Sequence, residues 1–117
     1  MEKKNEVLDL SFEFALEVIR YCDHLEESKK YILSRQLLKS GTSIGANIRE
    51  SQNAESAPDF IHKLKIAAKE ADETLYWLQL CEKSENYPDP DYLLQKLHSI
   101  RKILNTIIAT MKRKSKI

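Results

Sequence analysis

The fold of this chain is decided by the stretch Gln36-Leu-Leu-Lys-Ser-Gly-Thr-Ser-Ile-Gly-Ala-Asn-Ile-Arg-Glu50. At helical spacing, this stretch and the residues just before it separate into three lines of side chains. The apolar line consists of Leu33, Leu37, Gly41, Ile44 and Ile48. The basic line consists of Arg35, Lys39, Thr42 and Arg49. The third line, which we call the polar seam, consists of Gln36, Ser40, Ser43, Asn47 and Glu50.

The polar seam predicts a contact with protein rather than with water. A helix that faces only solvent has no reason to separate uncharged polar groups from charged ones. Each buried polar group in such a contact must find a partner, because an unpaired one costs about 1–3 kcal/mol. We therefore expect the seam to hold neighbouring helices or subunits in register.

The two glycines of the stretch also indicate close packing. Gly41 and Gly45 each cost a helix interior about 1 kcal/mol relative to alanine. The period of the apolar line continues through both, so we predict that a neighbouring helix backbone approaches them closely. We expect that neighbour to be the small-residue segment around Ala67, Ala68 and Ala71. A phosphate-binding loop is not indicated, because the Gly-Lys-Ser/Thr half of a Walker motif does not follow.

The composition bounds the remaining possibilities. The chain has 117 residues, of which 32% are charged, and its net charge of +1 gives no overall field that would recruit nucleic acid or a membrane. Cys22 and Cys81 lie far apart on apolar lines and form no metal-binding pattern, so we expect buried free thiols in a reducing cytoplasm. No apolar run reaches about 18 residues, so no membrane span is expected. The charged N-terminus does not resemble a signal peptide.

Hydrophobic periodicity and turn signals predict an all-α, antiparallel up-down four-helix bundle in a single domain, 1–117. The expected helices cover about 6–25, 30–54, 58–84 and 90–112, with a mobile basic tail at 112–117. Ser56 or Ala57 is expected to cap the third helix and Asp89 the fourth. The apolar face of the first helix is wider than the roughly 100° needed to cover one core. We therefore expect its outer flank to contact another subunit.

The polar seam also carries a family resemblance. The string Gln36-Leu37, Ser43-Ile44, Asn47-Ile48 and Glu50 resembles the bacterial four-helix-bundle proteins encoded in intervening sequences of large-subunit ribosomal RNA genes. That family includes relatives that serve as accessory proteins of diversity-generating retroelements, and the resemblance extends over about residues 8–111. It implies a homopentamer with no established catalysis. In the retroelement relatives it implies binding of nucleic acid and of a reverse transcriptase.

Two residue patterns could hold a metal ion or carry out acid–base catalysis, but a structural interpretation is favoured for each. Asp59-x-x-His62 and Gln95-x-x-His98 lack the paired Glu-x-x-His helices of a di-iron bundle, so we predict surface residues and no metal site. Glu50, Glu70 and Glu73 lack a nucleophile or a histidine, and a structural polar network is favoured over acid–base catalysis.

The aromatic residues Tyr76, Trp77, Phe60 and Phe14 are expected in the core or an interface rather than stacked on bases. We predict no catalytic residue and no cofactor.

The basic residues are the remaining functional candidates. Residues 89–117 contain seven Lys or Arg and two Asp, a net charge of +5 in a nearly neutral chain. The predicted nucleic-acid contacts are Arg35, Lys39, Arg49, Arg101, Lys102, Lys112, Arg113 and Lys114. Oligomerisation would repeat these charges and strengthen binding to RNA or DNA. Two alternatives stay open: these residues form only a solvated surface, or the protein is a structural oligomer whose partner is another protein.

Overall fold

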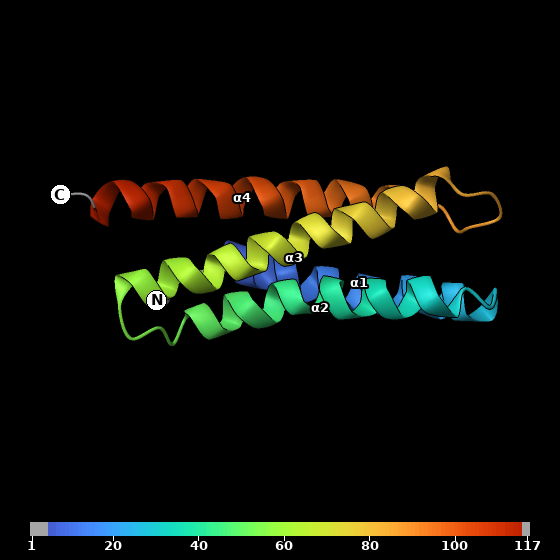
Figure 1. Ribbon diagram of the computed structural model, residues 1–117, viewed down its shortest axis with the longest axis horizontal. Helices are drawn as coiled ribbons and strands as arrows, with labels where there is room; N and C mark the ends of the chain where they lie inside the picture. The colour runs from blue at the N-terminus through green and yellow to red at the C-terminus, as the bar shows by residue number, and fades with distance from the viewer. Residues whose placement is uncertain (1–4, 116–117) are drawn as a thin grey trace.

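The computed structural model describes residues 5–115, which form four α-helices (Figure 1). The helices are α1 (Glu6–Glu27), α2 (Tyr31–Ser51), α3 (Ala57–Lys83) and α4 (Asp91–Ser115). Successive helices run in opposite directions, so α1 begins and α4 ends at the same end of the molecule. The predicted up-down bundle is thus confirmed, with no strand in the described part of the chain.

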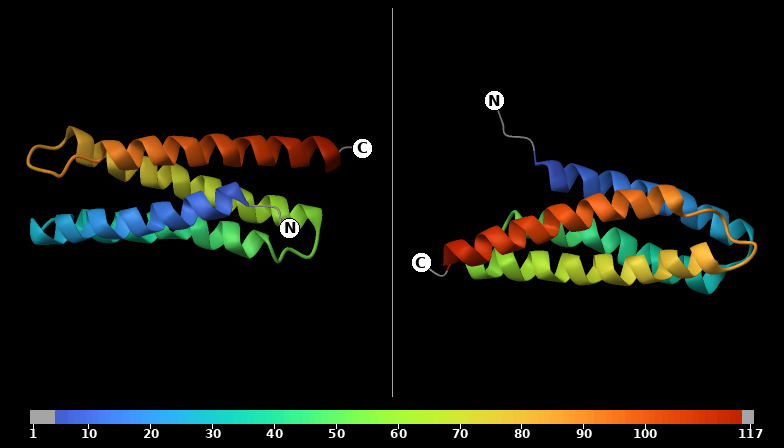
Figure 2. Two further views of the ribbon diagram at one scale, coloured as in Figure 1. Left: turned by 180° about the vertical axis from the view of Figure 1, so that it is seen from behind. Right: turned by 90° about the horizontal axis from the view of Figure 1, so that it is seen from above.

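Each helix packs against its neighbours in sequence, and α1 closes the bundle by contacting α4. The diagonal pairs, α1 with α3 and α2 with α4, have no Cα atoms within 8 Å of each other. The contact of α1 with α4 is the loosest of the four, because α1 leans away from α4 toward its N-terminal end (Figure 2). The α1/α2 edge and the α3/α4 edge therefore lie on opposite sides of the bundle.

The turns differ from the predicted ones in length. α1 continues through Glu27, so the predicted turn at 24–30 shrinks to three residues around Lys29, whose φ of 63° reverses the chain. α2 ends at Ser51, three residues before the predicted end. The amides of Gln52, Asn53 and Ala54 each donate to the carbonyl three residues earlier, which tightens the last turn and ends the α-helix.

The starts of the last two helices follow the predicted capping chemistry. Ser56 caps α3, and its hydroxyl accepts a hydrogen bond from the Asp59 amide (3.1 Å). The carboxylate of Asp89 accepts from the Asp91 amide (3.0 Å), and α4 begins at Asp91, one residue later than expected.

The predicted mobile tail at 112–117 is wrong for its first part, because α4 continues through Ser115. The helix period keeps Ile107, Ile108 and Met111 partly buried against the bundle, and this apolar line carries the helix into the basic residues. Lys116 and Ile117 lie outside the described residues, as do residues 1–4.

The core is a continuous apolar cluster to which all four helices contribute. Its fully buried large side chains include Phe14, Val18, Leu25, Leu37, Ile44, Ile48, Leu64, Leu78, Leu97, Ile100 and Leu104. The predicted apolar line of α2 thus faces inward. Burying a large apolar side chain contributes about 1.5–3 kcal/mol, so this cluster is the main source of stability.

The two glycines face α1 and not the alanine segment of α3, so the predicted partner is wrong. A Cβ atom at Gly41 would lie 2.9 Å from both γ-carbons of Val18. A Cβ atom at Gly45 would lie 3.3 Å from the backbone oxygen of Ser11. Gly41 and Gly45 lie toward the α1 flank of the apolar line, whereas the polar seam follows the α3 flank. Helical periodicity shows that the two flanks differ but not which neighbour lies on which side.

We predict that Gly41→Ala lowers the free energy of unfolding by about 1 kcal/mol, although alanine favours helix. Overpacking a core typically costs about 1–3 kcal/mol, which exceeds the roughly 1 kcal/mol gained in helix propensity. Val18 is fully buried and β-branched, so it has little freedom to move aside. Urea unfolding of Gly41→Ala in the wild type and in a Val18→Ala background measures the coupling. Alanine should stabilise only the second background; stabilisation in both would contradict the proposed contact.

Candidate functional site

The polar seam follows the edge of α2 that faces α3, and its members differ in depth. Ser40 is fully buried, and its hydroxyl shares a hydrogen bond of 2.9 Å with the hydroxyl of Thr74 on α3. Thr74 Oγ1 also lies 2.7 Å from the carbonyl oxygen of Glu70. Among the described residues, no buried side-chain nitrogen or oxygen lacks a partner. The buried part of the seam is therefore satisfied inside one subunit.

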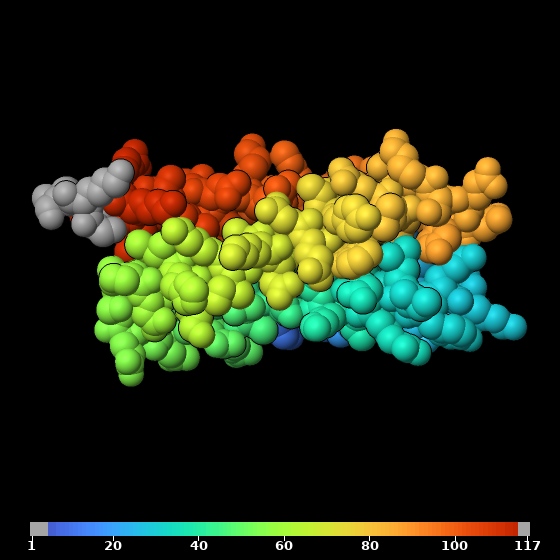
Figure 3. All heavy atoms as spheres, viewed as in Figure 1, coloured from blue at the N-terminus to red at the C-terminus, as the bar shows by residue number. Residues whose placement is uncertain are grey.

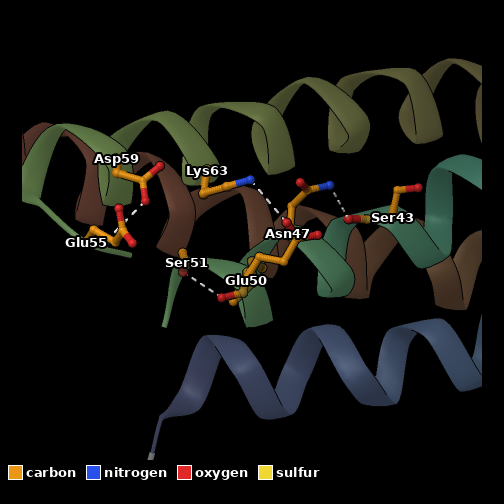
Figure 4. A network of polar contacts seen from close by, with 8 residues as sticks. Ser43, Asn47, Glu50, Ser51, Glu55, Asp59 and Lys63 are labelled. Carbon is orange, nitrogen blue, oxygen red and sulfur yellow. Dashed lines mark hydrogen bonds and ion pairs between the residues drawn. The ribbon is translucent and has the colours of Figure 1, made fainter. Parts of the chain in front are cut away.

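The other members of the seam lie nearer the surface. Ser43 and Asn47 are half-buried and bond to their own helix, with the Asn47 amide donating to the Ser43 carbonyl (2.9 Å). Glu50 is exposed and pairs with Lys63 of α3 at 3.1 Å (Figure 4). Gln36 is exposed. The outer seam thus presents polar groups along the α2/α3 boundary, where their role between subunits stays a prediction.

Acidic and aromatic residues of α3 lie along the same boundary. Burial and the neighbouring Glu73 raise the pKa of the Glu70 carboxyl, while Lys39 of α2 acts in the opposite direction. Trp77 is half-buried, and its ring nitrogen donates to the Glu73 carboxylate (3.4 Å). Tyr76 stacks edge-on against Trp77 but is 56% exposed, so it lies outside the core, and its place in an interface stays a prediction. It lies on the outer face of α3, which points away from the core.

An apolar surface runs along α1 beside α2. Phe12, Leu16 and Ile19 are 59%, 42% and 43% exposed, and we call these three the α1 apolar face. An open groove of about 880 Å³ between α1 and α2 adjoins it, with Phe12 and Ala46 among its lining residues. The predicted outer flank of α1 is therefore present and is left uncovered by the chain itself.

The basic residues predicted on α2 are exposed but have carboxylates on both sides. Within residues 5–115, no carboxylate lies within 4.0 Å of a side-chain nitrogen of Arg35, Lys39 or Arg49. Arg49 nevertheless lines the α1/α2 groove, whose α1 side carries the carboxylates Glu6, Asp9 and Glu13. Lys39 lies close enough to Glu70 to affect its pKa. The α2 residues thus form a mixed rather than a uniformly positive surface.

The basic residues of α4 have a different setting. Arg101 pairs with Asp72 of α3 at 2.5 Å, which joins α3 to α4. Lys102, Lys112, Arg113 and Lys114 are exposed on the helix. Lys65 and Lys69 of α3 are exposed as well, and they are not among the basic residues predicted from the sequence. The available signal was the absence of any acidic residue from Phe60 to Lys69.

The cysteines are buried free thiols, as predicted. Burial raises the pKa of the Cys22 thiol to about 11 and also raises the pKa of Cys81, so both stay protonated near neutral pH. A disulfide requires Cα atoms about 4.4–6.8 Å apart, and those of α1 and α3 are more than 8 Å apart. The thiols therefore serve as small core residues.

His62 and His98 are both exposed. The described residues contain no group of three or more His, Cys, Asp or Glu that could hold a metal ion. None of the described helices is long and apolar enough to cross a membrane.

The comparisons with known proteins agree with this geometry. A family model described as 23S rRNA-intervening sequence protein matches residues 3–106. The chain belongs to this family. A search of the curated proteins found no match.

A solved relative shares the bundle. It is described as a protein with unknown function from the S23 ribosomal protein family from Bacteroides thetaiotaomicron. Its crystal structure superposes with a TM-score of 0.84 at 45% sequence identity. The similarity covers 87% of this chain and 97% of that one. This chain and that solved relative thus share the bundle at 45% sequence identity.

The Ser40–Thr74 contact predicts a specific energetic pattern. Thr74→Val removes one hydroxyl and leaves the buried Ser40 hydroxyl with only a 3.5 Å contact to the Leu37 carbonyl. We expect a loss of about 1–2 kcal/mol in the free energy of unfolding. Ser40→Ala combined with Thr74→Val removes both polar groups and should cost less than the sum of the single variants. If denaturant unfolding shows that the double variant loses the sum of the two single losses in free energy of unfolding, the contact has no energetic role.

Proposed function

We propose that this protein is a non-catalytic, self-associating helical bundle that binds nucleic acid. The α1 apolar face carries the proposal, because it leaves three large apolar side chains in water on one helix. Clustered apolar surface of this kind marks interaction sites more often than scattered single residues do. The number of subunits expected from the family resemblance is five.

The position of this face supports self-association. Phe12, Leu16 and Ile19 recur at helical spacing and adjoin the α1/α2 groove, so a helix from a second copy has an apolar surface to cover. At about 25 cal/mol per Å², covering a few hundred Å² of apolar surface contributes several kcal/mol per contact. A closed ring would satisfy every copy of the face.

Binding to nucleic acid is supported by two independent observations. The matching family is described by an intervening sequence of 23S rRNA, and the solved relative by a ribosomal protein family. The predicted basic residues on α2 and α4 are exposed, apart from Arg101, which is half-buried and pairs with Asp72. No element resembles a base-reading motif, so phosphate contacts would supply affinity with little sequence preference.

A protein partner is the second candidate function. Tyr76 is largely exposed beside Trp77 and Glu73, and exposed aromatic residues are enriched in protein interfaces. This surface lies on α3, away from the α1 apolar face, and would stay accessible in an oligomer. A reverse transcriptase is the partner that the resemblance implies for one branch of the family. Co-purification with a reverse transcriptase encoded beside the gene would favour that branch.

We predict that Leu16→Lys reduces the oligomer to smaller species without loss of helix. A lysine in the centre of the α1 apolar face would have to be desolvated on assembly, which disfavours association. Light scattering measures the mass, and circular dichroism measures the helix content. Tyr92→Lys, at a position on α4 that is 55% exposed against 42% for Leu16, is the control and should assemble normally. A wild-type protein that stays monomeric at micromolar concentration would refute self-association.

We further predict that the wild-type protein binds labelled RNA and DNA at low salt with little sequence preference. Affinity should fall steeply with salt, because several subunits contribute phosphate contacts to one nucleic-acid strand. Fluorescence anisotropy at two or more salt concentrations measures both quantities. Absence of binding at low salt would rule out the nucleic-acid function and leave the protein-partner candidate.

A further inference from the structure

We infer that the adjoining surfaces of α3 and α4 form the binding surface for the phosphate backbone of nucleic acid. The inference rests on the proposed function and assigns it to Lys65, Lys69, Lys102, Lys112 and Arg113. We call these residues the α3/α4 basic face.

The face arises because two stretches without acidic residues lie side by side. α3 has none from Phe60 to Lys69, and α4 has none from Tyr92 to Lys114. The helices are antiparallel, and Asp72 pairs with Arg101. Each step from Asp72 toward the start of α3 therefore corresponds to a step from Arg101 toward the end of α4.

A second contact confirms this register. Ala68 and Asn105 line one small hollow together with the Asp72–Arg101 pair. Continuing the same register places Lys65 beside the turn of α4 that contains Ile108, and Lys112 beside the start of α3. Figure 3 shows this part of α3 and the C-terminal half of α4 in contact along one side of the molecule. The basic residues of the two helices consequently share one surface.

Four of the five cations on this face, Lys65, Lys69, Lys102 and Arg113, have no ion-pair partner among residues 5–115. Of the acidic residues of α3 near these lysines, Asp72 is paired with Arg101 and Glu73 accepts from Trp77. Glu70, which follows Lys69 in the sequence, is half-buried and lies near Lys39 of α2. Lys65, Lys69, Lys102 and Arg113 lie beyond 4.0 Å from any carboxylate of residues 5–115. The α2 basic residues differ, since Glu6, Asp9 and Glu13 lie across the groove from Arg49 and Glu70 lies near Lys39. A polyanion is therefore favoured at α3/α4 and disfavoured at α2.

A role in helix stability alone does not account for the face. Cations near the end of α4 would interact favourably with its helix dipole. Lys65 and Lys69 lie well inside α3 and gain nothing from either end of that helix. Their exposed positions beside α4 leave both side chains accessible to a partner outside the bundle.

The face has the extent of a short nucleic-acid segment. Eleven residues separate Lys102 from Arg113, a span of about 16 Å along α4. A nucleic-acid strand advances about 3.4 Å per nucleotide, so the face spans roughly five nucleotides. It also lies on the side of the bundle opposite the α1/α2 groove. Self-association through the α1 apolar face would leave it exposed and repeat it once per subunit.

Charge reversal on the two faces tests this inference. The variant Lys65→Glu/Lys69→Glu should bind a fluorescein-labelled single-stranded RNA more weakly. Its slope of log affinity against log salt should be smaller in magnitude than that of the wild type by about 1.4, because each contact to a single strand contributes about 0.7. The matched control Arg35→Glu/Lys39→Glu reverses the same number of charges on α2 and should keep most of the binding. Lys65→Arg/Lys69→Arg keeps the charge and should bind like the wild type.

The outcomes separate this inference from the proposed function. Absence of RNA binding by the wild type at low salt would refute both the nucleic-acid function and its assignment to the α3/α4 basic face. Wild-type binding that survives the α3 variant, or that is lost equally in the α2 control, would overturn only the assignment to the α3/α4 basic face. Light scattering and thermal unfolding of each variant complete the test. Loss of binding accompanied by loss of assembly or of folding would also overturn the assignment, because the lysines would then act through the structure.

Discussion

The close approach of α2 to α1 is the constraint on which the rest of the bundle depends. At Gly41 the backbone of α2 lies so near Val18 that even a methyl group does not fit without displacement. This contact fixes which flank of α2 meets α1, and the polar seam is thereby directed toward α3. Ser40 then shares a hydrogen bond with Thr74, and Glu50 forms an ion pair with Lys63. One steric contact thus orients the hydrogen bonds on the opposite flank of the same helix.

The sequence was sufficient to predict the helices, their order and the inward-facing residues, because these follow from local periodicity and turn chemistry. It was insufficient where the answer depends on which helix lies on which side. The sequence predicts that the glycines pack against Ala67 and Ala71 of α3. Their actual neighbours are Val18 and Ser11 of α1. For the end of α4 the sequence predicts a mobile tail, because the basic residues there obscure the apolar line of Ile107, Ile108 and Met111. That line packs against the bundle and continues the helix.

The candidate site was less predictable for the same reason. The basic residues of α2 share a helix face in sequence, yet the fold places carboxylates of α1 and α3 around them. Within the sequence of α3 alone, Lys65 and Lys69 do not differ from ordinary surface lysines. They become part of a larger basic surface only through the antiparallel register with α4, which the Asp72–Arg101 pair fixes. Surface charge patterns of a bundle therefore belong to pairs of helices rather than to single ones.

The faces of this member of the 23S rRNA-intervening sequence family can thus be assigned different roles. The α1 apolar face is suited to self-association, and the opposite α3/α4 basic face is suited to a polyanion. This division gives one molecule two surfaces that do not compete. Repetition of the outer edge in an oligomer would convert several weak phosphate contacts into measurable binding.

The most direct test of this division is hydroxyl-radical footprinting at increasing protein concentration. Phe12 of α1, Tyr76 of α3 and Tyr92 of α4 are exposed to nearly the same degree, at 59%, 56% and 55%. We expect Phe12 alone to lose reactivity as the protein assembles, while both tyrosines stay reactive. Constant reactivity of Phe12, or protection of Tyr92 in its place, would contradict the assignment of the α1 apolar face to self-association.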